Sequence, residues 1–263
     1  MPDRLDTPDP ADVREMFAGV APRYDSLNRL LSADLDRRWR QRAAAAVSRD
    51  PFDSAAPCSG QALVVAGARP LVVDVCTGTG DLAAAVLRRW RRARVVACDL
   101  CRPMLARARA KLAGADLARR SAVVEADALA LPMPDASADA ACCAFGVRNL
   151  ADEAAGLAEM VRVVRPGGRV VVLEFHRPRG LGPLAGIFRL YFRRILPTLG
   201  GWISTGRHGG YAYLVRSIER FGPPERLAET MRRAGLAEVR LVPLPGGVAS
   251  LYVGERGETK RLD

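Results

Sequence analysis

The sequence predicts an α/β fold in which a mostly parallel sheet carries helices on both faces, and three observations support this prediction. From Leu71 onward, short apolar runs typical of buried strands alternate with segments of helical periodicity. A glycine-rich turn around Gly78 and Gly80 joins the first apolar run to the first helical segment. The chain has 263 residues, of which 49% are hydrophobic and 26% charged, as in a folded domain with a substantial core.

The N-terminal part of the chain precedes this alternating pattern. Residues 1–12 are polar and rich in proline, and we expect a disordered tail. Residues 13–47 are expected to form an N-terminal helical segment, because apolar residues such as Phe17 recur at steps of three and four. Pro22 should break or kink this pattern. Residues 48–70 contain several prolines and glycines and are expected to form a linker.

Residues 71–256 are expected to form one domain. The first five strands are expected at 71–76, 94–99, 122–125, 138–145 and 169–175, and the helices among them at about 81–92, 103–112 and 152–164. The stretch 166–168, Pro-Gly-Gly, should form a tight turn into the fifth strand. A later helix, at about 224–234, should end at Gly235 as a glycine cap. Two last strands, 237–243 and 248–254, should form an antiparallel hairpin.

A helical insertion, 181–221, separates the fifth strand from the later helix. Within it, the stretch 184–196 interleaves apolar residues with Arg189, Arg193 and Arg194, which predicts an amphipathic helix with a basic side. Two interpretations remain open. The apolar side packs on the core as part of a cap, or it makes peripheral contact with a membrane or an isoprenoid tail.

The charge and the cysteines narrow the function classes. The net charge is +11, but 38 of the 40 basic residues are arginine and no single basic tract dominates, so nucleic acid is not expected as a partner. No apolar run is long enough to cross a bilayer and no targeting segment is evident, so we expect a cytoplasmic protein. Cys98 and Cys101 form a C-x-x-C without a second pair, so no metal site is expected.

The stretch 73–82, V-D-V-C-T-G-T-G-D-L, is the strongest chemical signal. Gly78 and Gly80 allow the backbone to approach a ligand closely, at the carboxyl end of a strand where open α/β sheets bind their ligands. The turn lacks the G-K-[ST] of a phosphate loop and the third glycine of the dinucleotide motif. It therefore indicates a cofactor site of another kind.

Two carboxylates follow in register with this turn. Asp99 ends the second strand, where a carboxylate can accept both hydroxyls of a ribose. Asp127 follows the third strand, where it and the Ala128 N–H could recognise an adenine. The alternatives are a helix N-cap for Asp99 and a turn residue for Asp127. The three features in series favour a nucleoside-containing cofactor.

This series, followed by the P-G-G turn, resembles the class I S-adenosylmethionine-dependent methyltransferases. Four further stretches, 17–32, 145–150, 173–178 and 211–221, are similar to the ubiquinone/menaquinone biosynthesis C-methyltransferase family. The resemblance covers about 13–254. It implies a Rossmann-like fold with a seven-stranded sheet, the cofactor S-adenosyl-L-methionine with S-adenosyl-L-homocysteine as product, and a polyprenyl quinol, either a naphthoquinol or a benzoquinol, as substrate.

The resemblance and the glycine turn together give a set of expected cofactor contacts. These are Asp74, Thr77, Gly78, Thr79, Gly80, Asp99, Asp127, Ala128 and Ala144. Ala144 stands where the family often has serine, so a hydroxyl contact is lost there and a backbone contact is expected. His176 also stands at a position where serine is common, and we do not expect it to be catalytic.

Three residues are the expected catalytic candidates. Deprotonation of a quinol hydroxyl makes the ring carbon nucleophilic, so a positioned base or a cation that stabilises the phenolate would help most. We expect Arg148 to stabilise the anion or to orient a water base, with a surface salt bridge as the alternative, and we expect Asn149 to orient the substrate oxygen. Tyr24, with Asp25, should close over the site, with simple helix packing as the alternative. His208 is expected to be a loop residue, with a base role left open.

Three other functions remain open. The chain could methylate another small-molecule or lipid acceptor, or bind the cofactor without turnover as a partner in an assembly. An RNA methyltransferase is opposed by the sequence 145–148, Phe-Gly-Val-Arg, which stands where such enzymes carry an N-P-P-Y-type tetrapeptide. A homodimer is also open.

Overall fold

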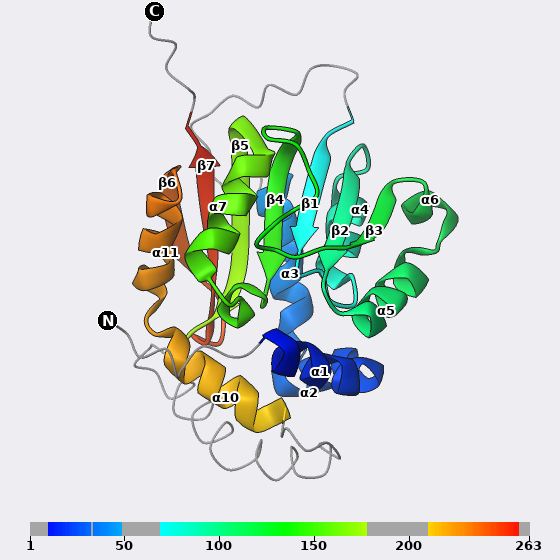
Figure 1. The fold of residues 1–263 in the computed structure, drawn as a ribbon, viewed down its shortest axis with the longest axis vertical. Coiled ribbons are helices and arrows are strands. Elements are labelled where there is room, and N and C mark those ends of the chain that lie inside the picture. Colours follow the sequence, from blue (N-terminus) through cyan, green and yellow to red (C-terminus); the bar gives the residue numbers. More distant parts are fainter. Residues whose placement is uncertain (1–9, 33, 49–68, 178–209, 258–263) are drawn as a thin grey trace, which may run out of the picture.

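A computed structural model of the chain describes residues 10–32, 34–48, 69–177 and 210–257 (Figure 1). Most of the expected linker at 48–70 lies outside these ranges, as do the stretch 184–196 and His208.

Seven strands form one sheet in the order β3-β2-β1-β4-β5-β7-β6. The strands are β1 (Leu71–Val75), β2 (Arg94–Asp99), β3 (Ser121–Glu125), β4 (Ala138–Ala144), β5 (Val164–Phe175), β6 (Leu236–Pro243) and β7 (Ala249–Arg256). The first five strands pair in parallel, and β7 runs antiparallel to both β5 and β6. This confirms the expected sheet and its C-terminal hairpin. The strand order reverses between β1 and β4, which is where such sheets bind ligands.

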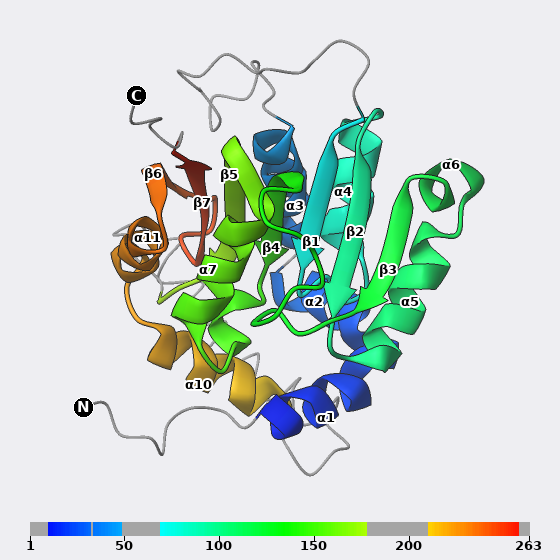
Figure 2. The same ribbon diagram turned by 45° about the horizontal axis from the view of Figure 1, so that its top comes forward.

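Helices cover both faces of the sheet (Figures 1 and 2). The α-helices are α1 (Pro10–Val20), α2 (Tyr24–Ser32), α3 (Leu35–Val47), α4 (Asp81–Arg89), α5 (Arg102–Leu112), α6 (Ala115–Ala118), α7 (Glu153–Val163), α10 (Gly210–Phe221) and α11 (Pro224–Arg233), and the short 3-10 helices are η2 (Ala21–Arg23) and η3 (Val147–Asn149). Helices α3 and α4 pack in one core cluster, and α7 and α11 pack in the other.

The two clusters meet the sheet on opposite faces because successive strand residues point to opposite sides. In β1, Val72 belongs to the cluster of α3 and α4, whereas Val73 and Val75 belong to the cluster of α7 and α11. All three side chains are at most 1% exposed. A strand buried on both faces is mostly apolar, and the run that predicted β1 is apolar at every position except the buried Asp74.

Two strands end one residue earlier than expected, at residues that take a left-handed conformation. Cys76 has φ of 54° and Phe145 has φ of 62°. A residue in this region cannot continue an extended strand, and the region is unfavourable for a side chain larger than glycine. Both residues therefore turn the backbone sharply where β1 and β4 end.

The expected tight turn at 166–168 is a different structure. Strand β5 begins at Val164 and runs through the Pro-Gly-Gly stretch. Its register against β4 jumps, because Ala138 pairs with Val164 whereas Ala140 pairs with Arg169. The extra residues form a bulge rather than a turn before the strand.

Helices α1 and α2 lie together beyond the carboxyl ends of the parallel strands, and α10 lies beside them (Figures 1 and 2). The first helix begins at Pro10, before the expected start at Val13. Pro22 lies in η2, which separates α1 from α2 and confirms the expected break. Within the described ranges, no helix is both long and apolar enough to span a bilayer.

Candidate functional site

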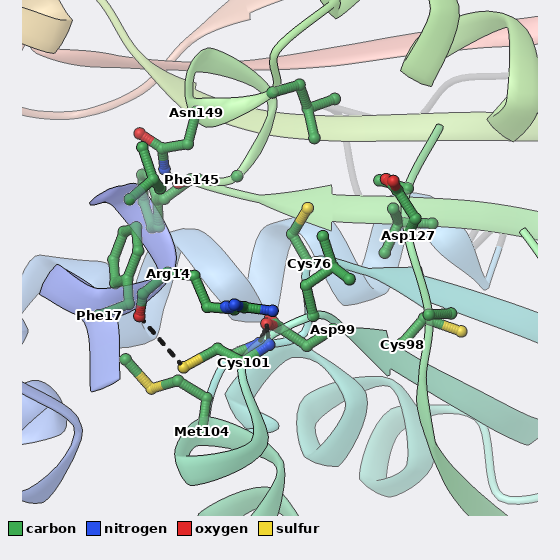
Figure 3. Close-up of a pocket in the computed structure, with 18 of the residues that line it drawn as sticks. Arg14, Phe17, Cys76, Cys98, Asp99, Cys101, Met104, Asp127, Phe145 and Asn149 are labelled. Atoms are coloured by element: carbon green, nitrogen blue, oxygen red, sulfur yellow. Dashed lines mark hydrogen bonds between the residues drawn. The ribbon is translucent and has the colours of Figure 1, made fainter. Parts of the chain in front are cut away.

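A pocket of about 950 Å³, counting its open mouth, lies at the carboxyl ends of β1, β2 and β4. The last residues of these three strands, Val75, Asp99 and Ala144, line the pocket. Helix α1 contributes Val13, Arg14 and Phe17 to the lining (Figure 3). The pocket is therefore enclosed between the sheet and the N-terminal helices.

The glycine turn forms one wall of the pocket. Gly78 and Gly80 have φ of 56° and 82°, a region that glycine adopts without strain. The Gly78 N–H donates to the Asp99 carboxylate at 2.8 Å. A Cβ at Gly78 would meet no protein atom within 4 Å, so the space above the turn is open to a ligand. A Cβ at Gly80 would lie 3.1 Å from that of Ala108, so Gly80 serves close packing on α5 instead.

The buried Asp74 side chain fixes the conformation of the glycine turn. Its side chain is fully buried and accepts hydrogen bonds from the Thr77 hydroxyl at 2.6 Å and the Ala83 N–H at 3.0 Å. Burial raises the pKa of Asp74 to about 6, and these hydrogen bonds oppose the rise. Asp74 and Thr77 do not line the pocket; they fix the turn that does.

Asp99 and Asp127 both line the pocket. The two oxygens of Asp99 accept from the N–H groups of Gly78 and Cys101, each at 2.8 Å. Burial raises the pKa of Asp99 and these backbone bonds lower it, with a net rise. Asp127 accepts from the Leu129 N–H at 2.9 Å and is exposed. Each carboxylate orders its own loop and still presents oxygens to the pocket.

Gly146 packs tightly at the turn after β4. A Cβ there would lie 2.4 Å from the Cβ of Cys76 and 2.8 Å from the Sγ of Cys143. A side chain there would collide with both cysteines, so glycine is required for this close packing. Phe145 and Gly146 both line the pocket.

The N-terminal segment contributes two aromatic side chains to the wall. Phe17 and Tyr24 meet edge to face, with ring centroids 6.0 Å apart. Burial raises the pKa of Tyr24 above its ordinary value of 10.0, against opposing effects from Asn28, Arg40 and Arg148. The Tyr24 hydroxyl is therefore protonated at neutral pH and can donate a hydrogen bond.

Arg148 is placed differently from our expectation. Its side chain is 5% exposed and donates to Glu174, which is 0% exposed. It also donates to the Phe145 carbonyl at 2.7 Å, and its guanidinium carbon lies 5.4 Å from the centre of the Phe175 ring. The residue does not line the pocket, and its charge is balanced by Glu174. It supports the turn after β4, and its ion pair is buried, unlike the surface salt bridge that was the alternative.

Asn149 lines the pocket as expected, and its amide is held from two sides. Its Nδ2 donates to the Phe145 carbonyl at 3.2 Å, and its Oδ1 accepts from the Tyr213 hydroxyl at 3.0 Å. Tyr213 comes from α10, so this helix fixes the orientation of Asn149. An amide nitrogen has two N–H donors, so one remains for a ligand.

The structure thus divides the expected site residues into two groups. Those that line the pocket are Gly78, Asp99, Asp127, Ala128, Ala144, Tyr24 and Asn149. Those that shape it from behind are Asp74, Thr77, Thr79, Gly80 and Arg148. The Thr79 hydroxyl donates to Asp25, at 2.5 Å.

The residues that line the pocket suit a nucleoside-containing cofactor. Two carboxylates can accept from hydroxyl and amino groups, the open space above Gly78 admits a ligand close to the backbone, and the remaining wall is largely apolar. His176 is excluded from this wall: it is buried, and its ring nitrogens contact the Ser250 hydroxyl and the Arg177 carbonyl.

Sequence reasoning assigned no role to several residues of the site. Glu174 and Tyr213 lie in stretches that carried the resemblance, but nothing in their spacing shows which side chain they contact. Arg14 on α1 had no distinguishing signal at all. Cys101 and Met104 follow Asp99 on the next turn and helix, and their position after a cofactor-type carboxylate could have suggested that they line the pocket.

Comparisons with known proteins agree with this geometry. The model of the ubiE/COQ5 methyltransferase family matches residues 6–256. Two similar relatives are each 46% identical to this chain, and each is named demethylmenaquinone methyltransferase. The relative from Deinococcus radiodurans aligns over 93% of this chain and 92% of its own length. The relative from Thermus thermophilus aligns over 92% of this chain and 100% of its own length. A third, from Geobacter sulfurreducens, is 38% identical, spans 93% of this chain and 88% of its own, and is named ubiquinone/menaquinone biosynthesis C-methyltransferase.

Solved structures support the fold. A SAM-dependent methyltransferase from Thermotoga maritima superposes with a TM-score of 0.56 at 17% identity, over 92% of this chain and 99% of its own. Another SAM-dependent methyltransferase, from Aquifex aeolicus, superposes with a TM-score of 0.51 at 19% identity, over 71% of this chain and 82% of its own. With a seven-stranded sheet of this order, a pocket at its switch point and a family match over nearly the whole length, the chain belongs to the ubiE/COQ5 methyltransferase family.

Proposed function

We propose that this protein transfers the methyl group of S-adenosyl-L-methionine to a ring carbon of a polyprenyl quinol, with demethylmenaquinol as the favoured acceptor. The observation that carries the proposal is the composition of the pocket. Its lining combines Asp99 and Asp127, carboxylates suited to a nucleoside-containing cofactor, with the aromatic ring of Tyr24 and the amide of Asn149. The names of the two relatives at 46% identity support the naphthoquinol over the benzoquinol.

In this proposal, the cofactor supplies an electrophilic methyl group, and the chain positions both reactants. Asp99 accepts from the ribose hydroxyls, and Asp127 with the Ala128 N–H recognises the adenine. Both carboxylates lie on the same wall as Gly78, so they fix the nucleoside along the ends of β2 and β3. Alignment of this kind supplies several kcal/mol of a typical enzymatic barrier reduction, on the order of 7 kcal/mol or more in the best cases.

The acceptor is held by the opposite wall. A deprotonated quinol oxygen makes the neighbouring ring carbons nucleophilic, and donors aimed at that oxygen stabilise it. We assign these donors to the Tyr24 hydroxyl, which its raised pKa keeps protonated, and to the second N–H of Asn149. Arg148 acts behind them as a positioning residue, because Glu174 balances its charge.

A direct assay tests the proposal. The purified protein is incubated with methyl-labelled S-adenosyl-L-methionine and with the reduced forms of short-tailed demethylmenaquinone or demethylated benzoquinone. We expect label on the naphthoquinol ring carbon. Label on the benzoquinol alone would reverse the acceptor preference. Cofactor binding without label on any quinol would overturn the proposal and favour another acceptor or a non-catalytic partner.

The same proposal extends to a membrane surface. A polyprenyl quinol resides in the bilayer, so its ring must be reached from the interface. The stretch 184–196 alternates apolar and basic residues in its sequence, a composition suited to peripheral contact with anionic lipid. This part of the proposal rests on sequence alone.

A further inference from the structure

The chain's use of lysine is unusual and directs attention to one position. Its 40 basic residues include only two lysines, Lys111 and Lys260. Of these, Lys111 alone falls within the described part of the chain, near the end of α5. In a sequence that uses arginine almost everywhere else, a retained lysine points to a geometry that arginine does not satisfy.

The Lys111 ammonium contacts three oxygens from three separate elements. Its Nζ lies 2.9 Å from the Asp25 carboxylate on α2 and 3.0 Å from the Thr79 hydroxyl in the glycine turn, and it donates to the Asp81 carboxylate at the start of α4. An ammonium has three rotatable donors around one small centre, whereas a guanidinium presents a planar fork. Three acceptors around one nitrogen therefore favour lysine.

The contact between Lys111 and its two carboxylate partners is partly shielded from water, and it contains one positive and two negative charges. The side chains of Lys111, Asp25 and Asp81 are 21%, 20% and 28% exposed. Two carboxylates share one cation, and Thr79 also donates to Asp25, at 2.5 Å. Without the ammonium, the carboxylates of α2 and α4 would lose the cation that they share, and Arg29 would be left as the cation acting on Asp25. Repulsion between the two carboxylates would then weaken the attachment of α2 to α4.

The segment that this contact holds covers the pocket. Residues 10–32, which we call the N-terminal cover, contribute Val13, Arg14, Phe17 and Tyr24 to the pocket wall. The cover has other described attachments near α5. Ala21 forms a small cluster with Cys101 and Met104, against which Phe17, Ala18, Val20 and Tyr24 pack. The Cys101 thiol donates to the Arg14 carbonyl at 3.9 Å, and the exposed Arg107 donates to the Pro22 carbonyl. Lys111 adds an ionic contact that reaches the glycine turn and α4.

We infer that Lys111 is a positioning residue that locks the N-terminal cover onto the glycine turn. This contact couples retention of the cofactor, which the turn faces, to the position of Tyr24 on the wall that binds the acceptor. Asp25 is the residue next to Tyr24, so fixing Asp25 fixes the start of the helix that carries the Tyr24 hydroxyl. Thr79 lies next to Gly78, so the same ammonium holds the turn that faces the cofactor. The effect on catalysis rests on the proposed function, whereas the lock itself does not.

Hydrogen exchange of the full-length, cofactor-free protein tests the lock. We expect Lys111→Met to speed exchange in residues 10–32 by about tenfold or more, as when a shielded charge pair loses one partner, while β1 and β4 keep wild-type protection. Arg109→Gln is the matched control: it lies on the same helix and donates to the Val123 carbonyl, not to the cover.

Two further variants separate charge from geometry. Lys111→Arg should restore protection only in part, because the planar group does not reach all three oxygens. Asp25→Asn in the Lys111→Met background should recover some protection, because it removes the repulsion from Asp81. Stopped-flow measurement should show faster cofactor dissociation from Lys111→Met, and the acceptor KM should rise more than kcat falls.

The outcomes are distinguishable. If Lys111→Met leaves exchange of residues 10–32 at the wild-type rate, the lock is wrong, whatever the enzyme methylates. If Lys111→Arg restores protection completely, charge alone suffices and the proposed lysine geometry is wrong. If the cover loosens but no quinol is methylated by the wild type, the lock holds and only the proposed acceptor fails.

Discussion

The Arg148 guanidinium donates to the Glu174 carboxylate in a place where neither side chain is more than 5% exposed. Glu174 also accepts the Arg148 backbone N–H, at 3.3 Å, so side chain and main chain of one residue share one carboxylate. The pair joins the turn after β4 to the end of β5. Burial raises the pKa of Glu174 and the nearby Arg148 opposes the rise.

Removing one member of this pair should therefore destabilise the fold. We expect Glu174→Ala to lower the free energy of unfolding by about 3–5 kcal/mol, because it leaves a buried cation without its counter-charge. The double variant Arg148→Met with Glu174→Leu should lose less than Glu174→Ala. Urea unfolding measures all of them. As a control, Glu229→Ala removes ion pairs on the surface of α11 and should leave the free energy of unfolding unchanged. A double variant less stable than the single one would contradict the argument.

Asp99 should dominate recognition of the cofactor's ribose. Asp99→Ala is expected to weaken binding of S-adenosyl-L-methionine by about 1–3 kcal/mol, since hydroxyls lose a charged acceptor. Titration calorimetry measures this. Asp116→Ala, which changes an exposed carboxylate on α6 paired with Arg120, should leave the affinity unchanged. A folded Asp99→Ala protein with wild-type affinity would remove Asp99 from the site.

Gly146 should tolerate no side chain. Gly146→Ala places a Cβ 2.4 Å from that of Cys76, and we expect a loss of about 1–3 kcal/mol in unfolding free energy from overpacking. Cofactor binding should also weaken because the pocket wall moves. Gly114→Ala is the matched control, since a Cβ there meets no atom within 4 Å. Equal melting temperatures for the two variants would show that the turn after β4 is less tightly packed than described.

The ion pair between Asp25 and Lys111 should make the free energy of unfolding decrease as the pH falls. Burial raises the pKa of Asp25, but hydrogen bonds from Lys111 and Thr79 outweigh it, so the pKa lies below the ordinary 3.8. The folded chain thus keeps this carboxylate ionised to lower pH than the unfolded chain. Its contribution is present above the unfolded pKa and is lost as pH falls through the folded one.

Thermal melts at a series of pH values check this. Between about pH 5 and pH 3, the melting temperature of the wild type should fall more steeply than that of Asp25→Asn, which has no charge to lose there. Parallel curves for the two proteins would show that the Asp25 pairing contributes no acid-sensitive stability.

The basic residues of the stretch 184–196 should bind anionic lipid. The wild type is expected to sediment with anionic vesicles at low salt and to be released at high salt, with each arginine worth about 1 kcal/mol near the surface. Changing Arg189, Arg193 and Arg194 to Gln should abolish sedimentation and spare activity on a short-tailed quinol. Absence of wild-type binding at low salt would make the stretch part of the core.

Local signals in the sequence determined much of the fold. Runs such as 71–75, apolar at every position except Asp74, predicted buried strands, because a strand covered on both faces is mostly apolar. The glycine turn and Asp99 predicted one wall of the pocket, because the carboxyl ends of parallel strands meet at one edge. Pro22 correctly predicted the break between α1 and α2.

Other features depended on contacts between residues far apart in the chain. Arg148 was expected to face the substrate, and only the tertiary structure shows that Glu174, 26 residues later, balances its charge. Thr79 was expected to touch the cofactor, but its hydroxyl meets Asp25, 54 residues earlier. Spacing along a strand or helix predicts which face a side chain occupies. The partner that satisfies a buried charge is decided by packing, because it comes from whichever element the fold brings to that face.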